Sequence, residues 1–431
     1  MAHTIDVASV EPFEICSIRP PTENFSLTFR LTRNCGWNQC LFCPVYKYGA
    51  RFSRRPLEDV KRDVDRARVI DDLLSVRGVV PGDRTRQAYG EASTLVAEIR
   101  RARGAEGPDE EAQEGLDREA FEDERVAWFA SWFKERPTLE DSIQNVLAWR
   151  LHGGETCFLG DANGLVVPPG FFLDIVSYIK AAFPTLRRFT VYGRTRSVAR
   201  KKPEDLAAFA AAGLHRIHFG IESGSDAVLA FMRKGETAAD HIEGCVRTRQ
   251  AGLSPSVYVM PGLGGAKWSL EHAVETARVL TRARPDYVRL RSMEVFAGTG
   301  LAAAVEAGTF VEASEEQVVR EIRTLVEQTE TETVIVSDSA SNLLDVNGRL
   351  PEDRDRMLDV IDDYLSLSSR AKLAYSLESR LQSFMGQYGG VTEDIMRVIR
   401  PCIAGDRLDI SGVSDNQVVA AIRLIRGKLM P

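Results

Sequence analysis

Residues 215–233, HRIHFGIESGSDAVLAFMR, change their character within a few positions. The stretch up to Ile221 is rich in strand-forming side chains, and Glu222 stands at the carboxyl end of this predicted strand. The small polar residues Ser223-Gly224-Ser225 come next and open a predicted helix. A strand followed directly by a helix is the repeating unit of a parallel sheet, because the helix carries the chain back to the starting edge.

The same alternation extends in both directions from this unit. Predicted strands cover residues 25–32, 156–160, 187–193, 215–221, 254–260, 286–293 and 332–337. Predicted helices between them cover residues 55–74, 170–182, 203–212, 224–233, 238–251, 269–282 and 315–329. The pattern predicts an α/β fold, a partial TIM-like barrel of six to seven βα units. Parallel barrels carry their chemistry on loops at the carboxyl ends of the strands, so we search those loops for functional residues.

Three further regions flank or interrupt this barrel. Residues 75–150 form a predicted helical insertion after the first βα unit, and its acidic part (106–124) is predicted to be a partly flexible surface excursion. The segment VAWFASWF (126–133) is predicted to be a helix with a buried aromatic face. Residues 1–24 are a predicted N-terminal extension and 25–342 the barrel. Residues 343–431 are a predicted helical C-terminal cap, with a helix starting at Pro351 and Glu352.

Composition narrows the class of protein. No apolar run approaches the roughly 20 residues of a membrane span, and the N-terminus lacks the basic-then-apolar order of a signal peptide. The predicted location is therefore the cytoplasm. The net charge of −7 argues against nucleic acid as the substrate, since proteins that bind it usually present a basic face. In a reducing compartment, clustered cysteines indicate metal ligands rather than disulfides.

A loop with three cysteines follows the first predicted strand. Residues 31–49 read LTRNCGWNQCLFCPVYKYG and place Cys35, Cys40 and Cys43 within nine residues. A structural zinc site requires four ligands, and no histidine lies near this loop. A [4Fe–4S] cluster has four irons, so three cysteines leave one iron open for a substrate or cofactor. The alternative is a zinc site completed by a histidine or by one of three distant cysteines: Cys157, Cys245 and Cys402.

The loop resembles the signature of the radical S-adenosylmethionine (radical SAM) superfamily, C-x3-C-x2-C with an aromatic residue before the last cysteine. Phe42 is that aromatic residue, but the first gap is one residue longer, which predicts a bulge at Gly36–Trp37. Residues 220–235, GIESGSDAVLAFMRKG, resemble a segment after the fourth strand in the branch that contains methylthiotransferases, B12-dependent radical SAM enzymes and oxygen-independent coproporphyrinogen dehydrogenases. The resemblance covers residues 25–345.

The resemblance implies a [4Fe–4S] cluster held by Cys35, Cys40 and Cys43, with SAM on the open iron and Phe42 beside its adenine. The superfamily also has a GGE motif that binds the amino group of SAM after the second strand. Here GGE (153–155) precedes a predicted strand and so lies at the wrong end of the sheet. We therefore assign the SAM amino group to the loop after that strand, with these candidates: Gly160, Asp161 and Asn163.

Later strand ends supply the remaining candidates. The predicted SAM contacts are Arg194, Glu222, Ser223, Gly224 and Met260. A helix N-terminus near Ser223 suits a polar ligand, and the glycine turn after Met260 lets a purine ring approach the backbone. Of Arg289 and Arg291, only one is expected to point into the barrel. Arg291 and Asp338 are the candidate catalytic residues, and Asn342 is a further candidate for substrate contact.

These observations predict an enzyme of the radical SAM type. The resemblance implies that the cluster cleaves SAM reductively to a 5′-deoxyadenosyl radical, which abstracts hydrogen from a small organic substrate. A flavodoxin or ferredoxin would supply the electron. Two alternatives remain open: a radical SAM enzyme that acts on tRNA or a tetrapyrrole, and a non-catalytic iron–sulfur or zinc protein that serves as a sensor or scaffold. The sequence does not identify the substrate.

Overall fold

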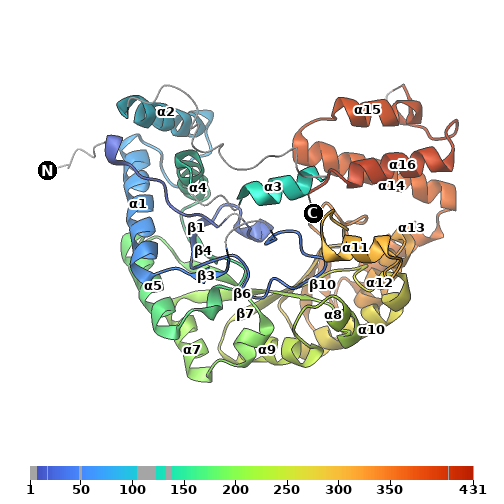
Figure 1. Ribbon diagram of the computed structural model, residues 1–431, viewed down its shortest axis with the longest axis horizontal. Helices are drawn as coiled ribbons and strands as arrows, with labels where there is room; N and C mark the ends of the chain where they lie inside the picture. Colours follow the sequence, from blue (N-terminus) through green and yellow to red (C-terminus); the bar gives the residue numbers. More distant parts are fainter. Residues whose placement is uncertain are drawn as a thin grey trace.

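One open sheet organises the chain, as Figure 1 shows in a computed structural model that describes residues 7–16, 18–47, 51–103, 123–132, 137–405 and 407–430. The sheet has eight strands in the order β1-β4-β5-β6-β7-β8-β9-β10. Their bounds are β1 Leu27–Arg30, β4 Thr156–Gly160, β5 Arg188–Gly193, β6 Leu214–Glu222, β7 Ser254–Val259, β8 Tyr287–Leu290, β9 Thr333–Val336 and β10 Gly348–Leu350. Within this sheet all neighbouring strands run parallel except β10, which is antiparallel to β9. The sheet does not close, which confirms the predicted partial barrel.

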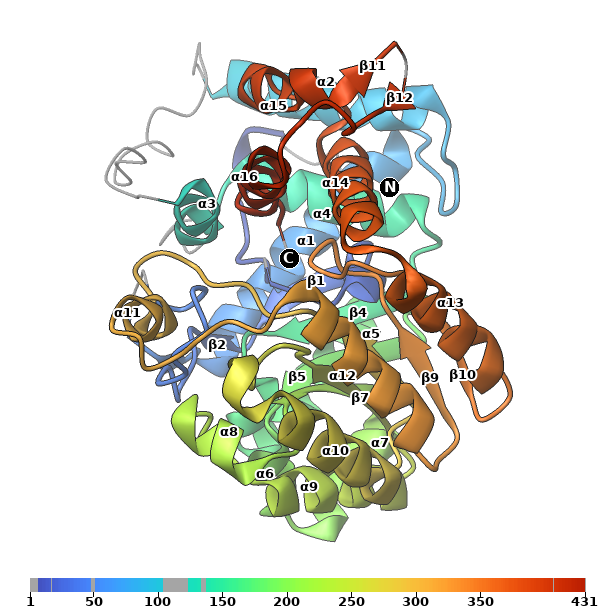
Figure 2. The ribbon, with the colours of Figure 1, turned by 90° about the vertical axis from the view of Figure 1, so that its right-hand side faces the viewer.

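Helices cover the outer side of the sheet (Figures 1 and 2). Those of the barrel are α1 Leu57–Val76, α5 Pro169–Ala182, α6 Thr195–Ala199, α7 Pro203–Ala212, α8 Asp226–Phe231, α9 Ala238–Gln250, α10 Gly265–Ala283, α11 Gly300–Glu306 and α12 Glu315–Gln328. Capping boxes at Thr237 and Ser314 start α9 and α12, because each side chain satisfies a backbone N–H at the helix start. Gly213 ends α7 at φ 116°, a conformation that favours glycine.

The two faces of the sheet differ in chemistry. Alternate residues of a strand point to opposite faces, and Ile217, Val257 and Val288 belong to the hydrophobic core between sheet and helices. The opposite face, which lines the barrel, is polar: the Tyr192 ring lies 6.0 Å from that of His218 and 6.5 Å from that of Tyr258. A polar lining leaves the barrel interior suited to bind a polar molecule.

Helices also form the insertion and the C-terminal region. The insertion contains α2 Arg86–Ala102, α3 Glu124–Trp132 and α4 Leu139–Leu151. In α3, Phe129 is buried against Phe296 at 5.9 Å, whereas Trp128 is 37% exposed. Most of the acidic excursion, residues 104–122, lies outside the described residues, as does Phe133, so its predicted flexibility stays a prediction. Among the described residues, no helix is long and apolar enough to cross a membrane.

After residue 343 the chain is mainly helical. Helices α13 Arg354–Ser366, α14 Ser369–Tyr388, α15 Glu393–Ile399 and α16 Asp415–Arg426 occupy this part. Helices α14 to α16 share a hydrophobic cluster of their own, centred on Leu377 and Ile422. Two predictions are corrected: β10 lies in this region, and α13 starts at Arg354, since Pro351 and Glu352 belong to the preceding turn. The domain boundaries at 24/25 and 342/343 stay predictions.

Candidate functional site

The three cysteines lie in the loop between β2 (Thr32–Arg33) and β3 (Ser53–Arg54), just beyond the carboxyl end of β1. The two short strands pair antiparallel and close the base of this loop. All three thiols are half-buried. Cys40 and Cys43 pack beside an apolar cluster that contains Phe42, Met232 and Leu263. The loop therefore stands at the chemically active end of the barrel, where the sequence places it.

Asp161 ties this loop to the sheet. It follows β4, is 2% exposed, and its carboxylate lies 2.9 Å from the Arg30 guanidinium. The same carboxylate accepts hydrogen bonds from the backbone N–H of Asn34 (3.1 Å) and from the Tyr46 hydroxyl (3.1 Å). It thus holds the loop on both sides of the cysteines. The carboxylate of Asp161 is thus bonded to protein groups, and its predicted role as a contact of SAM stays a prediction.

The extra residue of the cysteine motif falls in a turn at Asn38. Asn38 has φ 44°, and asparagine tolerates this left-handed conformation better than most residues. Its side-chain amide donates to the carbonyl of Tyr46 at 2.5 Å, and its backbone N–H donates to Cys35 Sγ at 3.4 Å. The left-handed residue lies one position beyond the predicted bulge at Gly36–Trp37.

Trp37 fixes the other side of the loop. Its indole N–H donates to the carbonyl of Arg233 at 2.7 Å, and the Arg194 guanidinium lies 5.0 Å from its ring. A Cβ at Gly235 would lie 2.3 Å from the ring, so only glycine fits there. The backbone N–H of Leu41 also donates to the carbonyl of Met232 at 3.0 Å. The longer gap between Cys35 and Cys40 thus carries a side chain that docks the loop on the segment after α8.

Burial disfavours the free thiolate form of two of the three cysteines. Burial raises the pKa of Cys40 to about 11, although Lys234 nearby opposes the shift. Burial also raises the pKa of Cys43, against hydrogen bonds from the backbone of Val45 and Tyr46. Hydrogen bonds to sulfur are a feature of iron–sulfur sites. Within the described residues, no three His, Cys, Asp or Glu side chains converge on one metal ion. A cubane binds each cysteine through a different iron and so does not require such convergence.

Glu222 and Lys234 form an ion pair beside Cys40. Glu222 ends β6 at φ 63°, where the pairing with β7 is irregular. Lys234 Nζ lies 3.1 Å from Glu222 Oε1. A Cβ at Gly220 would lie 2.1 Å from the same oxygen, so glycine makes room for the carboxylate. Burial disfavours the charged form of Lys234, but Glu222 and Cys40 outweigh it and raise the pKa of Lys234. Lys234 was not among the predicted site residues. It could have been found from its position in the MRKG turn (232–235), which closes the segment that resembles the superfamily.

Ser223 and Gly224 face helix α10 rather than open space. Ser223 Oγ lies 2.8 Å from Nδ1 of His272, and the backbone N–H of Gly224 donates to Thr276 Oγ1 at 2.8 Å. Helix α8 starts only at Asp226 and has six residues. Residues 223–225 thus lead into a helix as predicted, with Ser225 as its N-cap, and the predicted SAM contacts of Ser223 and Gly224 stay predictions.

The predicted SAM contacts Asn163 and Arg194 differ in how many of their polar atoms already have protein partners. Asn163 donates to Ser197 Oγ at 2.9 Å, and its side-chain oxygen has no hydrogen-bond partner among the described residues. Arg194 donates to Glu236 Oε2 (3.2 Å) and to the carbonyl of Lys234 (2.7 Å). Glu236, which the sequence analysis missed, is buried. Burial acts to raise the pKa of Glu236, but Lys234 and Arg194 lower it.

The predicted SAM contacts Gly160, Phe42 and Met260 are described by the side chains that pack around them. A Cβ at Gly160 would lie 2.1 Å from Cys16 Sγ, so this glycine accommodates the buried Cys16. Phe42 is 9% exposed, and Met260 is half-buried in the same apolar cluster beside Cys40 and Cys43. The structure therefore brings Phe42 and Met260 together at the cysteine loop.

Both Arg289 and Arg291 face the barrel interior. Both arginines lie close enough to Tyr258 to lower its pKa. Burial has the larger, opposite effect, so the pKa of Tyr258 is raised overall. The prediction that only one points inward is wrong, because residues two apart in a strand share a face. Arg289 is 3% exposed and donates to Asp338 Oδ2 at 2.6 Å. Arg289 is thus a partner of Asp338.

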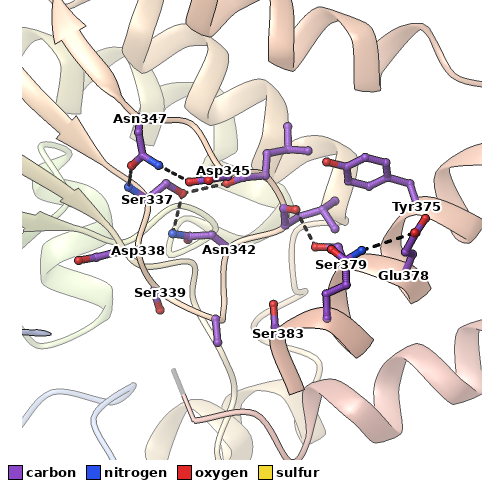
Figure 3. A pocket seen from close by; sticks show the side chains of 14 residues that line it. Ser337, Asp338, Ser339, Asn342, Asp345, Asn347, Tyr375, Glu378, Ser379 and Ser383 are labelled. Atoms are coloured by element: carbon purple, nitrogen blue, oxygen red, sulfur yellow. Dashed lines mark hydrogen bonds between the residues drawn. The ribbon is translucent and has the colours of Figure 1, made fainter. Parts of the chain in front are cut away.

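Asp338 also lines a cavity of about 800 Å³ between the loop after β9 and helix α14 (Figure 3). The loop contributes Asp338 and Asp345, and α14 contributes Tyr375, Glu378 and Ser379. Figure 3 shows Asp338 on the side of the cavity away from α14. The predicted substrate contact Asn342 instead holds the loop together. Its side chain accepts from the backbone N–H of Ser292 at 2.9 Å and donates to the carbonyl of Leu290 at 2.8 Å.

A buried carboxylate on α12 supports two loops of this site. Glu321 accepts hydrogen bonds from the backbone N–H of Gly262 and from Ser269 Oγ, both at 2.5 Å. Its Oε2 lies 3.8 Å from Nε2 of His272, which contacts Ser223. Burial raises the pKa of Glu321 to about 7 and lowers the pKa of His272 to about 4.

The raised pKa of Glu321 predicts a loss of stability with rising pH. The folded protein binds this proton more tightly than the unfolded chain does. Its contribution to the free energy of unfolding is therefore complete below about pH 4.5 and lost as pH rises through about 7, a loss of about 3 kcal/mol. Glu321→Gln should show a smaller decline than wild type in urea unfolding between pH 5 and pH 8.

The exposed Glu306→Gln is the matched control and should keep the wild-type slope. His272 is present in both proteins, and Glu321→Gln removes only the carboxyl group. Parallel stability curves for wild type and Glu321→Gln would contradict the assignment.

Comparison with known proteins finds one superfamily whose sequence profile the chain matches. A sequence profile described as the radical SAM superfamily matches residues 128–278. Residues 128–278 thus carry a match to the radical SAM superfamily. Members of that superfamily are enzymes that bind a [4Fe–4S] cluster and SAM. The matched range begins after the cysteine loop. No curated protein matches the chain.

Solved structures of radical SAM proteins resemble the chain at low identity. The archaeal Elp3 of Methanocaldococcus infernus is 16% identical, with 49% of this chain and 53% of that one covered, and a TM-score of 0.37. The radical SAM methyltransferase TsrM of Kitasatospora setae, with cobalamin and a [4Fe–4S] cluster bound, is 14% identical, with 65% and 37% covered and a TM-score of 0.38. Coproporphyrinogen III oxidase (HemN) of Escherichia coli is 11% identical, with 64% and 79% covered and a TM-score of 0.31. The chain thus spans about half or less of the first two structures.

Proposed function

We propose that Cys35, Cys40 and Cys43 hold the [4Fe–4S] cluster and that the enzyme abstracts hydrogen from a small organic substrate at the barrel mouth. The observation that carries the proposal is a loop of three half-buried thiols, tied to the carboxyl edge of the sheet by Asp161 and Trp37. When bound, the cluster and SAM supply a 5′-deoxyadenosyl radical. A flavodoxin or ferredoxin type of protein is the proposed electron donor.

The residues of the chain position and shield these groups. Phe42 and Met260 offer an apolar wall at the cysteine loop, which suits the adenine of SAM. Asn163 has a buried amide oxygen that can accept a hydrogen bond from SAM. Glu222, with Lys234 at 3.1 Å, is the charged pair nearest the cluster site. Excluding water here protects a radical from side reactions.

The interior face of the barrel is the proposed substrate site. It carries Arg289, Arg291 and Tyr258 within reach of one another. Asp338 joins this face to the cavity of about 800 Å³ beside α14, a volume within the range of small-molecule sites. We infer a polar substrate that enters through this cavity, in preference to tRNA or a tetrapyrrole.

Anaerobic reconstitution with iron and sulfide tests the proposal. The full chain should bind about four irons and four sulfides, the content of one cubane. With dithionite and SAM it should then release 5′-deoxyadenosine. One zinc per chain without acid-labile sulfide would instead support a non-catalytic zinc protein.

A further inference from the structure

A second cavity lies at the opposite end of the sheet from the cysteine loop. Its volume is about 350 Å³, and the residues that line it come from the starts of β6, β7, β8 and β9 and from β10. The cysteine loop and Asp161 follow the carboxyl ends of the strands, so this cavity is separate from the candidate active site. In barrels of this kind, the amino-terminal end of the strands is not where the reaction takes place.

This cavity carries an excess of positive charge. Four arginines line it: Arg216, Arg249, Arg284 and Arg349. The carboxylates among its lining residues are Asp286 and Glu332, which leaves a formal excess of two positive charges. Clustered like charges destabilise a fold unless an anion or a carboxylate compensates them.

The protein compensates only part of this charge. Arg249 pairs with Asp286. Arg216 stacks 4.1 Å from the centre of the Tyr287 ring, and its Nε lies 3.4 Å from Ser254 Oγ. Within the ranges that the structure covers, the guanidinium groups of Arg284 and Arg349 make no ion pair and no hydrogen bond; the backbone N–H of Arg349 donates to Asp353 Oδ2 at 2.8 Å. These two guanidinium groups are therefore available to a ligand.

A buried hydroxyl adds a polar group without a protein partner. Thr333, the first residue of β9, lines the cavity and is 1% exposed. Within the described part of the chain, its hydroxyl oxygen makes no hydrogen bond. Buried polar groups are normally paired, so an unpaired hydroxyl beside free guanidinium groups points to a ligand that accepts hydrogen bonds.

We propose that this cavity binds a phosphate group, either free phosphate or the phosphate of a small monoester. A phosphomonoester carries a charge of about −1.5 to −2 at pH 7, which matches the excess of two positive charges. Arginine is the preferred residue for phosphate because its planar fork donates two parallel hydrogen bonds. The volume of 350 Å³ leaves room for an organic portion beside Tyr287.

Calorimetric titration of the full-length protein with ribose 5-phosphate, inorganic phosphate and ribose, at constant ionic strength, tests the proposal. Both phosphates should bind and ribose should not. The double variant Arg284→Gln/Arg349→Gln should bind roughly tenfold or more weakly, because charge-assisted hydrogen bonds are lost. Arg282→Gln, an exposed arginine of α10 outside the cavity, should bind as wild type. Tighter binding of ribose 5-phosphate than of inorganic phosphate would identify the monoester as the ligand, and equal binding would identify free phosphate.

A second variant is expected to strengthen phosphate binding rather than weaken it. A misfolded protein would not bind more tightly, so this variant separates an effect on binding from a loss of folding. Glu332→Gln removes a carboxylate that repels phosphate, so it should tighten binding. Wild-type protein that binds neither phosphate would overturn the proposal. So would a double variant that binds like wild type, Arg282→Gln that loses as much affinity as the double variant, or Glu332→Gln that weakens binding.

Discussion

Cys35→Ala, Cys40→Ala and Cys43→Ala should each leave the reconstituted protein without an intact [4Fe–4S] cluster. Each thiol is one of three proposed ligands, and the loop offers no fourth thiol to replace it. Changes to residues that merely support a metal ligand typically lower metal affinity by 10–100-fold, so removal of a ligand should exceed roughly 100-fold. Iron and acid-labile sulfide per chain, measured after anaerobic reconstitution and desalting, provide the readout.

Cys402→Ala is the matched control for these variants. Cys402 is a free cysteine buried in the separate hydrophobic cluster of the C-terminal helices. This variant should retain the iron and sulfide content of wild type. Full metal content in any of the three loop variants would remove that residue from the ligand set. A loss in Cys402→Ala equal to theirs would favour a zinc or iron site completed by a distant cysteine.

Asp161→Asn should lower the free energy of unfolding by about 3–5 kcal/mol, the usual cost of removing one partner of a buried ion pair. The asparagine removes the counter-charge nearest the buried Arg30 guanidinium, 2.9 Å away, and leaves the Glu14 carboxylate at 3.8 Å. It also weakens the hydrogen bonds that hold Asn34 and Tyr46 on either side of the cysteines. Urea unfolding of the apoprotein should show the loss, and cluster content should fall with it.

Asp174→Asn gives the comparison, because Asp174 is an exposed carboxylate on α5. A surface change of this kind usually alters stability by less than about 0.5 kcal/mol. Equal unfolding curves for the two variants would show that Asp161 does not tether the loop. Normal stability with lost SAM binding would support the predicted role of Asp161 as a SAM contact.

The sheet could be predicted because its strands are short runs with turn signals between helices. Strand β4 lies at residues 156–160 as predicted, and the other parallel strands differ by a few residues at most. Strand β10 was missed because three residues, Gly348–Leu350, carry no periodicity of their own. Its strand character comes from pairing with β9, a tertiary contact that the local sequence does not contain.

Site residues were harder to predict. The rule that functional residues follow the carboxyl ends of parallel strands locates a side chain but does not say which groups it contacts. The rule places Asp161 at the correct end of β4, but the partners that take up its carboxylate come from 131 and 115 residues away. Ser223 and Gly224 likewise meet α10, about 50 residues later. Lys234 and Glu236 were missed because turn residues of this kind are usually solvated, and only the fold shows that they lie beside Cys40 and Arg194.

Release of 5′-deoxyadenosine is the measurement that tests the central claim most directly. Anaerobically reconstituted wild-type protein, given dithionite and SAM, should form 5′-deoxyadenosine. The triple variant Cys35→Ala/Cys40→Ala/Cys43→Ala should form none above the background without protein. Equal formation by the triple variant, or none by a wild-type protein that holds its full iron and sulfide, would contradict the account.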